Sequence, residues 1–333
     1  MALNLKSLHL LVIEDLAPMR ELIISVLKVQ GFTNVSFAAD GKAGFELFCR
    51  YNHDIILTNW NAPSHSGTEM VHQIRTSPSS PNKMVPIIIM TGLASRERIS
   101  QARDVGINEI LIKPFSAKDL SKRLLYIIQT PRDFVNTAQF HGPDRRRRAV
   151  TDFSGANRRL ETAPKEIIKA SNLLQSKVGL GDISEQSILS SQNLISNNKI
   201  NFIPIASNFL AQLRENLNIA YQSTNRGQRL IEDLSDPIIQ IKANARIFKY
   251  DLMGDLASVM MGFLDNLKIL DPDALTIIDA HHTTLNYLLQ NEMKGDGGAV
   301  GQNLQTELES ACKRYTNNRA KQIQKALKNL HSE

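Results

Sequence analysis

Five polar residues follow short apolar runs in the first third of the chain. A pair of carboxylates comes after the first run, an amide after the third, a hydroxyl after the fourth and an ammonium after the fifth: Glu14 and Asp15, Asn59, Thr91, and Lys113. Adjacent carboxylates repel each other unless a cation lies between them, so the pair suits Mg²⁺ with oxygen ligands. A hydroxyl and an ammonium opposite the pair would hold the oxygens of a phosphoryl group.

The apolar runs before these residues indicate the strands of one sheet. Runs at 8–13, 34–39, 54–58, 86–90 and 109–112 alternate with segments that have the spacing of amphipathic helices. Such alternation predicts an α/β fold, a five-stranded parallel, doubly wound, flavodoxin-like sheet with helices on both faces. Ligands of these sheets bind beyond the carboxyl ends of the strands, so the five polar side chains should meet there.

The bulk composition narrows the class of protein. The chain has 333 residues, of which 42% are hydrophobic and 22% charged, a balance typical of a folded chain with two domains. Cys49 and Cys312 follow no ligand spacing, which favours a reducing setting. The first apolar run ends in two carboxylates, unlike a signal peptide, and no stretch reaches the length of a membrane span. We therefore expect a soluble, cytoplasmic protein without a membrane span.

Residues 8–129 resemble the receiver domain of bacterial two-component response regulators, of the chemotaxis-regulator type. The resemblance rests on the acid pair Glu14-Asp15, on Trp60-Asn61-Ala62-Pro63 with Gly67, on Met90-Thr91-Gly92 and on Lys113-Pro114-Phe115. It implies a phosphorelay signalling protein that contacts protein partners, a histidine kinase or a second copy of the chain among them. The face that the family uses for docking lies on the fourth and fifth strand-helix units.

The resemblance also assigns roles to the polar residues. Glu14 and Asp15 become candidate ligands of a weakly held Mg²⁺, and Thr91 and Lys113 become the phosphoryl pocket. The bond between Lys113 and Pro114 is expected to be cis. Without a bound metal, the acid pair would serve as loop and helix-cap residues, with Lys113 in a salt bridge to Asp15.

Two residues depart from the family pattern, and both predict a receiver that has lost aspartyl phosphorylation, a pseudo-receiver. Asn59 stands at the phosphoacceptor position, and an amide is a poor nucleophile that cannot form an acyl phosphate. Its lack of charge should also lower the affinity for Mg²⁺. Ile110 stands at the aromatic switch position and cannot move a polar ring between exposed and buried states. Gly92 in place of the usual alanine is a milder change.

An alternative is a receiver that still responds to a kinase or a small phosphodonor. It would use weak pocket chemistry or the hydroxyl of Thr58, which directly precedes Asn59. Strand alternation predicts that Thr58 points into the core and away from the acids, which disfavours this alternative.

A basic segment follows the receiver-like part. Residues 141–160 hold six arginines against two aspartates, a local excess of +4 within a net charge of +6. The run Arg145, Arg146, Arg147 and Arg148 raises the alternative of a nucleic-acid-binding regulator, or of another anion contact. No aromatic residues interleave with the run and no clear helix-turn-helix follows, so a solvated linker is favoured. We predict a receiver at 1–130, a basic linker at 131–164 and an all-α output or interaction region at 165–333.

The last part of the chain shows helical spacing and no strand-like run after about residue 130. It predicts a bundle of four to six helices, with a turn at Asp236-Pro237 and a loosely held polar stretch at 181–201. The segments IKANARIFKYDLMGDLA and IIDAHHTTLNYLL, and FHGPDRR before them, resemble uncharacterised parts of regulators of alphaproteobacterial type. This resemblance implies no function.

His281 and His282 are the candidates for phosphotransfer in the helical part. A lysine and a glycine usually follow such a histidine closely, whereas Lys294 and Gly295 come late here. Neighbouring helical residues point about 100° apart, so at most one of the two should face the core. An ordinary half-buried histidine is favoured. No residue set indicates an enzyme or a metal-ligand cluster.

Overall fold

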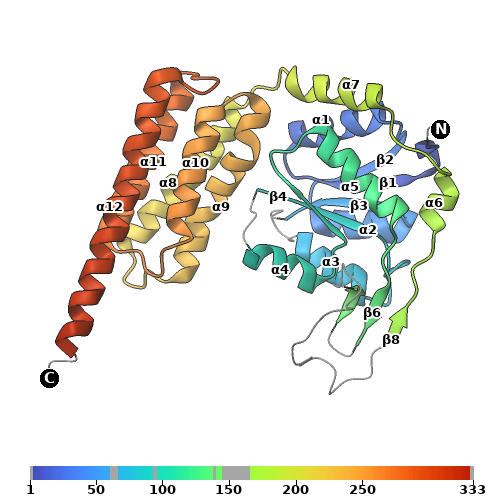
Figure 1. Cartoon of the computed structure of the whole chain (residues 1–333), viewed down its shortest axis with the longest axis horizontal. Coiled ribbons are helices and arrows are strands. Elements are labelled where there is room, and N and C mark those ends of the chain that lie inside the picture. The colour runs from blue at the N-terminus through green and yellow to red at the C-terminus, as the bar shows by residue number, and fades with distance from the viewer. Residues whose placement is uncertain (1–2, 61–66, 93–95, 138–139, 145–165, 331–333) are drawn as a thin grey trace, which may run out of the picture. The chain divides into compact units, whose positions relative to one another are not determined.

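The computed structural model describes residues 3–60, 67–92, 96–137, 140–144 and 166–330 (Figure 1). The chain divides into two compact units, Met1–Asn198 and Lys199–Glu333. The first contains the predicted parallel sheet and the second contains helices.

The sheet of the first unit has five parallel strands. They are β1 (His9–Ile13), β2 (Asn34–Ala38), β3 (Ile55–Asn59), β4 (Ile87–Thr91) and β5 (Glu109–Ile112), in the spatial order β2-β1-β3-β4-β5. Every residue of β3 and β4 is buried, as expected for central strands covered on both faces. The continuous apolar runs in the sequence reflect this burial, and the predicted fold is confirmed.

Four helices connect the strands, a fifth follows β5, and together they cover the two faces of the sheet (Figure 1). They are α1 (Ala17–Val29), α2 (Gly41–Tyr51), α3 (Gly67–Thr76), α4 (Arg96–Val105) and α5 (Ala117–Gln129). Asp40 caps α2 by accepting from the backbone N–H of Ala43, and Ser116 caps α5 in a capping box with Asp119. These caps fix where the two helices begin, and the cap of α5 follows Lys113 by three residues.

Three short strands show that the prediction of no strand after about residue 130 was wrong. β6 (Phe134–Asn136) pairs antiparallel with β7 (His141–Pro143) and with β8 (Glu166–Ile168). Strands of three residues are too short to show a clear alternation in the sequence. β7 lies against the turn between α4 and β5, because a Cβ added at Gly106 would lie 3.1 Å from the backbone oxygen of His141.

A buried arginine links this small sheet to the receiver-like fold. Arg75 of α3 is 1% exposed. Its guanidinium donates to the backbone oxygens of Gly106 (3.0 Å), Lys83 (2.7 Å) and Val85 (2.9 Å) and to Oδ1 of Asn108 (3.1 Å). The guanidinium carbon also lies 5.1 Å from the ring centroid of Phe134 in β6. Burial lowers the pKa of Arg75 to about 9, still well above neutral pH.

Two further helices belong to the first unit, α6 (Leu173–Val178) and α7 (Glu185–Ser196). α7 lies along α1 and α5 (Figure 1). Ser191 donates to the backbone oxygen of Val26, and Gln192 accepts from the backbone N–H of Ala117 at 2.9 Å. The prediction of a loosely held stretch at 181–201 was wrong for α7, because its polar side chains make specific hydrogen bonds and Ile195 is buried.

The second unit is a helical bundle, as the periodicity predicts. Its helices are α8 (Ile203–Gln222), α9 (Gln228–Asn244), α10 (Asp251–Leu264), α11 (Pro272–Gln290) and α12 (Gly298–Leu330). The predicted turn at Asp236-Pro237 was wrong, because α9 continues through Pro237. Leu234 and Ile238 are fully buried on either side of the proline, and their packing outweighs the lost backbone hydrogen bond. Within the described part of the chain, we find no helix with the length and apolarity of a membrane span.

At the amino end of the sheet, a buried histidine gives the first unit a pH dependence. His53 is 1% exposed, neither of its ring nitrogens has a hydrogen-bond partner, and its ring lies 4.0 Å from that of His9. Burial lowers the pKa of His53 from 6.5 to about 4. Between about pH 4 and 6.5, His53 therefore binds a proton in the unfolded chain but stays neutral in the folded chain. The stability that the first unit has above pH 6.5 is lost progressively as the pH falls towards about 4.

Replacement of His53 by leucine is expected to reduce the loss of stability between pH 6.5 and about 4. Stability near neutral pH should be kept, because leucine removes two unpaired polar atoms from a buried position. Urea unfolding measured across the acid range tests the expectation, with the exposed His72→Leu as the matched control. An equally steep fall of the free energy of unfolding with falling pH in His53→Leu and in the native chain would contradict it.

Candidate functional site

The carboxyl end of the sheet brings the five predicted polar residues together. Glu14 follows β1, Asn59 ends β3, Thr91 ends β4 and Lys113 follows β5. Their exposed fractions are 0%, 4%, 5% and 2%, respectively, and Asp15 is half-buried. The register of the parallel strands produces this convergence, since β1 and β4 are both neighbours of β3.

The side-chain amide of Asn59 donates to both members of the acid pair. Its Nδ2 lies 2.9 Å from Oδ1 of Asp15 and 3.3 Å from Oε1 of Glu14. Its Oδ1 accepts from the backbone N–H of Trp60 at 2.9 Å. The two carboxylate acceptors near Nδ2 and the backbone donor near Oδ1 fix the orientation of the Asn59 amide. Its N–H groups therefore point between the carboxylates, where a cation would otherwise relieve their repulsion.

Lys113 forms a buried ion pair with Glu14. Its Nζ lies 2.5 Å from Oε2 of Glu14, and both side chains are almost fully buried. The expected salt bridge to Asp15 was wrong, because the Glu14 carboxylate turns into the protein while Asp15 stays at the rim. Burial raises the pKa of Glu14, and the charge of Lys113 opposes that rise. The site thus satisfies its own negative charge with an ammonium and an amide.

The neighbouring residues follow most of the sequence expectations. Thr58 is fully buried and its hydroxyl donates to the backbone oxygen of Asn59 at 3.2 Å, so it faces the core as strand alternation predicts. Ile110 is partly buried and packs against the apolar core on the side of α2 and α3. The Lys113-Pro114 bond is cis, as the resemblance implies. Asn61, Ala62 and Pro63 lie outside the described residues.

Gly67 sits where no side chain fits. Its backbone N–H donates to the backbone oxygen of Trp60 at 3.1 Å, and a Cβ added there would lie 2.0 Å from the backbone oxygen of Asn59. Gly67→Ala is expected to displace the end of β3 and to lower the free energy of unfolding by about 1–3 kcal/mol. Urea unfolding and Trp60 fluorescence would measure both effects.

The control for this substitution is Gly262→Ala in α10. An added Cβ meets no atom within 4 Å there, and alanine favours the helix. Equal effects of the two substitutions on the free energy of unfolding would refute the steric account of Gly67.

The two adjacent histidines of α11 are both buried, so the prediction that at most one faces the core was wrong. His281 is 0% exposed and His282 is 6% exposed. Nδ1 of His282 accepts from Arg214 at 2.7 Å, and its Nε2 donates to the backbone oxygen of Leu210 at 3.0 Å. α11 packs against α8, α10 and α12, which together cover more than one side of it. Burial lowers the pKa of both rings, and neither presents the exposed imidazole that phosphotransfer needs.

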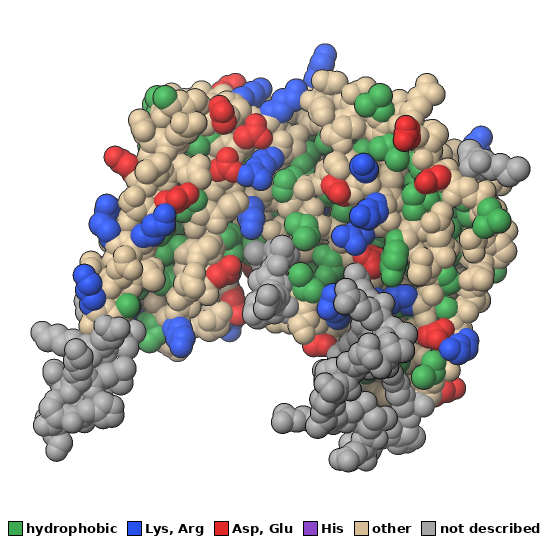
Figure 2. Space-filling model, in the orientation of Figure 1, with side chains coloured by type: hydrophobic (Ala, Val, Ile, Leu, Met, Phe, Trp, Pro, Cys, Tyr) green, Lys and Arg blue, Asp and Glu red, His purple; other side chains and the backbone are tan. Residues whose placement is uncertain are grey.

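The arginine run has no described structure. Arg145, Arg146, Arg147 and Arg148 lie outside the described residues, so their contact with an anion or nucleic acid stays a prediction. On the face drawn in Figure 2, basic and acidic side chains of the described residues are interspersed. The assignment of most of the excess positive charge to residues 141–160 therefore rests on the sequence alone.

Comparisons with known proteins agree on the first part of the chain. The family model of the response regulator receiver domain matches residues 10–125. Chemotaxis protein CheY-3 of Vibrio cholerae is 30% identical over 119 residues, which make up 36% of this chain and 90% of the relative. Chemotaxis protein CheY of Pseudomonas aeruginosa is 30% identical over 122 residues, 37% of this chain and 97% of the relative.

Two solved structures show the same extent of similarity. Chemotaxis protein CheY4 of Vibrio cholerae is 28% identical and covers 36% of this chain and 98% of its own, with a TM-score of 0.34. The receiver domain of a sensor histidine kinase of Pseudomonas aeruginosa, with a magnesium ion coordinated in its active site cleft, is 28% identical. It covers 36% of this chain and 94% of its own, with a TM-score of 0.33.

One family accounts for the sheet order, for the converging strand ends and for the nearly full-length matches to two chemotaxis proteins. Through residues 10–125, this chain belongs to the response regulator receiver domain family of two-component signalling proteins.

Proposed function

We propose that this protein is a pseudo-receiver, which signals by protein–protein contact without aspartyl phosphorylation and is not an enzyme. The observation that carries the proposal is the Asn59 amide, which donates to Glu14 and Asp15 at 3.3 and 2.9 Å. An acyl phosphate forms when a carboxylate oxygen attacks phosphorus and the donor's leaving group departs. A neutral amide that is held by three hydrogen bonds cannot supply that nucleophile.

The same arrangement fits Mg²⁺ poorly. A magnesium ion needs oxygen ligands in near-octahedral geometry, and here amide N–H groups occupy the gap between the carboxylates. One oxygen of Glu14 is already paired with Lys113 at 2.5 Å. Among the described residues, no group of three His, Cys, Asp or Glu side chains could hold a metal. We propose that Mg²⁺ binds weakly at this site.

The partner of such a pseudo-receiver is proposed to be a protein of a signalling pathway, a histidine kinase or a second copy of this chain. α4, β5 and α5 form the candidate docking face. Ile112 of β5 and Tyr126 of α5 are 43% and 36% exposed there. The helical second unit would serve as the output or interaction region, in the cytoplasm.

The alternative of a kinase-responsive receiver loses one of its two routes. Thr58 is fully buried, so its hydroxyl cannot reach a phosphodonor. The other route, weak phosphoryl chemistry in the pocket of Glu14, Asp15 and Asn59, remains. The beryllofluoride experiment examines that route.

Beryllofluoride binding in the presence of Mg²⁺ tests the proposal. Trp60 is the only tryptophan, and its backbone N–H is bonded to the Asn59 side chain, so its fluorescence reports on the pocket. The native chain is expected to show no saturable response, while Asn59→Asp responds. A saturable response of the native chain would mean that the pocket still senses a phosphoryl-like ligand, which contradicts the proposal.

A further inference from the structure

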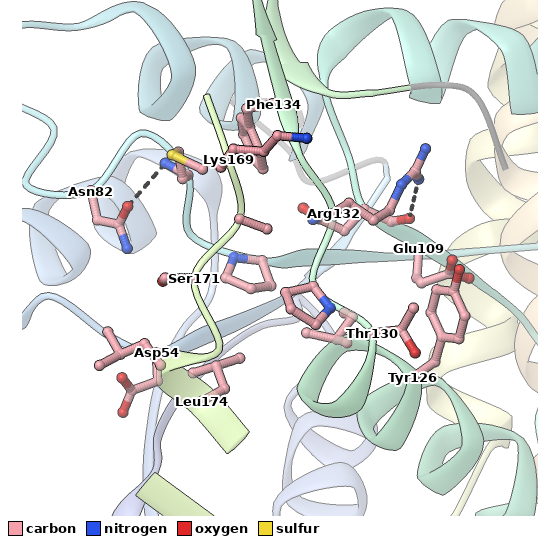
Figure 3. Close-up of a pocket in the computed structure, with 17 residues that line it drawn as sticks. Asp54, Asn82, Glu109, Tyr126, Thr130, Arg132, Phe134, Lys169, Ser171 and Leu174 are labelled. Atoms are coloured by element: carbon pink, nitrogen blue, oxygen red, sulfur yellow. Dashed lines mark hydrogen bonds between the residues drawn. The ribbon is translucent and has the colours of Figure 1, made fainter. Parts of the chain in front are cut away.

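A cavity of about 400 Å³ lies at the amino end of the parallel sheet. Asp54, which directly precedes β3, lies on its floor. Residues from the segment 130–134 form one wall, and residues from the segment 169–174 form the other (Figure 3). Ser171 and Leu173 of the second wall are exposed, so the cavity opens to solvent on that side.

The chemistry of the lining favours an apolar occupant. Its apolar surface comes from Met84, Pro86, Ile127, Pro131, Phe134, Leu173 and Leu174. The charged side chains of the lining have partners within the same unit: Asp54 has Lys177 (2.6 Å), Glu109 has Arg123 (2.8 Å), Lys169 has Asp133 (2.8 Å), and Arg132 donates to the backbone oxygens of Asn108 and Asp144. An ion would therefore gain little here, whereas an apolar group would cover apolar surface that now faces solvent.

An exposed leucine lies close to this cavity in the sequence. Leu180 is 75% exposed, more than any other large apolar side chain among the described residues. It stands between Gly179 and Gly181, in the connection from α6 to α7. Gly179 has a φ angle of +82°, which a residue with a side chain rarely adopts. The glycine thus allows the chain to turn and to leave Leu180 at the surface.

Hydrogen bonds hold the backbone on both sides of Leu180. The backbone N–H of Asn4 donates to the backbone oxygen of Val178 at 2.9 Å, and Nε2 of Gln129 donates to the backbone oxygen of Gly181 at 2.9 Å. Val178 is only 4% exposed and anchors the loop in the unit. The loop therefore presents Leu180 in a fixed place, which lowers the entropic cost of burying it against a partner.

α6 connects the cavity to Leu180. Leu173 and Leu174 at the start of α6 line the cavity, and Leu180 follows the end of the helix by two residues. A helix of 6 residues is about 9 Å long, so both features belong to the edge of the first unit along which α6 runs (Figure 1). A twofold axis between them would bring Leu180 of each of two copies to the cavity of the other copy.

We propose that two copies of this chain form a dimer by this exchange, with Leu180 of each copy inserted into the cavity of the other. Leu173 at the mouth, which is 56% exposed in the single chain, would be covered at the same time. Each cavity would then be completed by a residue of the second copy. The proposal does not depend on the pseudo-receiver proposal, because it uses the amino end of the sheet and not the acid pair.

Sedimentation velocity of the full-length chain at increasing concentration tests the proposal. The native chain is expected to pass from monomer to dimer. Leu180→Ser should raise the dissociation constant of the dimer about a hundredfold, since burial of each of the two leucines contributes about tenfold or more. Leu189→Ser is the matched control, because Leu189 is 63% exposed on α7 and lies outside the lining. It should dimerise as the native chain does.

A second variant separates the two halves of the contact. Ala170→Trp fills the cavity from a half-buried position and should weaken the dimer as strongly as Leu180→Ser. In an equimolar mixture, Leu180 of the Ala170→Trp chain can still enter the open cavity of the Leu180→Ser chain. Heterodimers about tenfold tighter than either homodimer are therefore expected, once circular dichroism verifies the helix content of Ala170→Trp.

Three results would overturn the proposal. The first is a native chain that stays monomeric at every concentration. The second is a Leu180→Ser chain that dimerises as tightly as Leu189→Ser, which would place any dimer contact elsewhere. The third is a mixture of folded Leu180→Ser and Ala170→Trp chains that associates no better than either chain alone.

Discussion

Replacement of Arg75 by methionine is expected to lower the free energy of unfolding of the first unit by about 3–5 kcal/mol. The guanidinium bonds three backbone oxygens and Oδ1 of Asn108, and the residue is 1% exposed. Methionine fills a similar volume but donates no hydrogen bond, so four acceptors lose a buried donor. Urea unfolding followed by Trp60 fluorescence reports on this unit, because Trp60 is the only tryptophan of the chain.

The loss of stability in Arg75→Met should extend to the small sheet of β6, β7 and β8. Arg75 contacts Phe134 of β6 and also bonds Gly106, against which β7 packs. Hydrogen exchange is therefore expected to speed up in β6 and β7 together with the amino end of β5. Arg103→Met, at an exposed position of α4, is the matched control. A loss no larger than that of the control would contradict the structural role of Arg75.

Replacement of Asn59 by aspartate is expected to make the stability of the first unit depend on Mg²⁺. The new carboxylate would stand against Glu14 and Asp15 in place of an amide that now donates to both. Without a cation, the added repulsion should cost about 2–4 kcal/mol at a separation near 4 Å and an effective dielectric constant near 20. Bound Mg²⁺ would relieve the repulsion and, at a hundredfold excess over its dissociation constant, add about 2.7 kcal/mol.

Urea unfolding with and without Mg²⁺ measures both parts of this expectation. The native chain should unfold at the same urea concentration in either buffer, because its carboxylates already have Asn59 and Lys113 as partners. Asn193→Asp, at an exposed position of α7, controls for an added carboxylate elsewhere. A native chain that Mg²⁺ stabilises as strongly as it stabilises Asn59→Asp would contradict the account of the site.

The sequence was sufficient to predict the receiver fold and the place of its polar residues. Continuous apolar runs identified β3 and β4, which are buried at every position, and the strand ends that converge are the ends that the runs define. Side-chain partners could not be predicted in the same way. Whether Lys113 pairs with Glu14 or Asp15 depends on which carboxylate turns inward, and neighbouring acids in a sequence do not reveal that.

The elements that the sequence did not predict depend on contacts between distant segments. β6 and β8 are three residues long and pair across 30 to 34 positions, so no local pattern marks them. Pro237 suggested a turn, yet buried neighbours keep α9 continuous. Arg75 looks like an ordinary helical arginine, and only the fold surrounds it with backbone oxygens. A cavity of about 400 Å³ at the amino end of the sheet, lined by Asp54, Asn108 and residues of the segment 169–174 (Figure 3), likewise appears only when that segment returns to the sheet.

The most direct test of the central claim is covalent labelling by a small phosphodonor. The native chain and Asn59→Asp would be incubated with acetyl phosphate and Mg²⁺, and each intact protein would then be weighed by mass spectrometry. The account predicts no phosphoryl adduct on the native chain and an adduct on Asn59→Asp that neutral hydroxylamine removes, as expected of an acyl phosphate. A hydroxylamine-sensitive adduct on the native chain would show that another carboxylate accepts the phosphoryl group, and would contradict the claim that Asn59 silences the site.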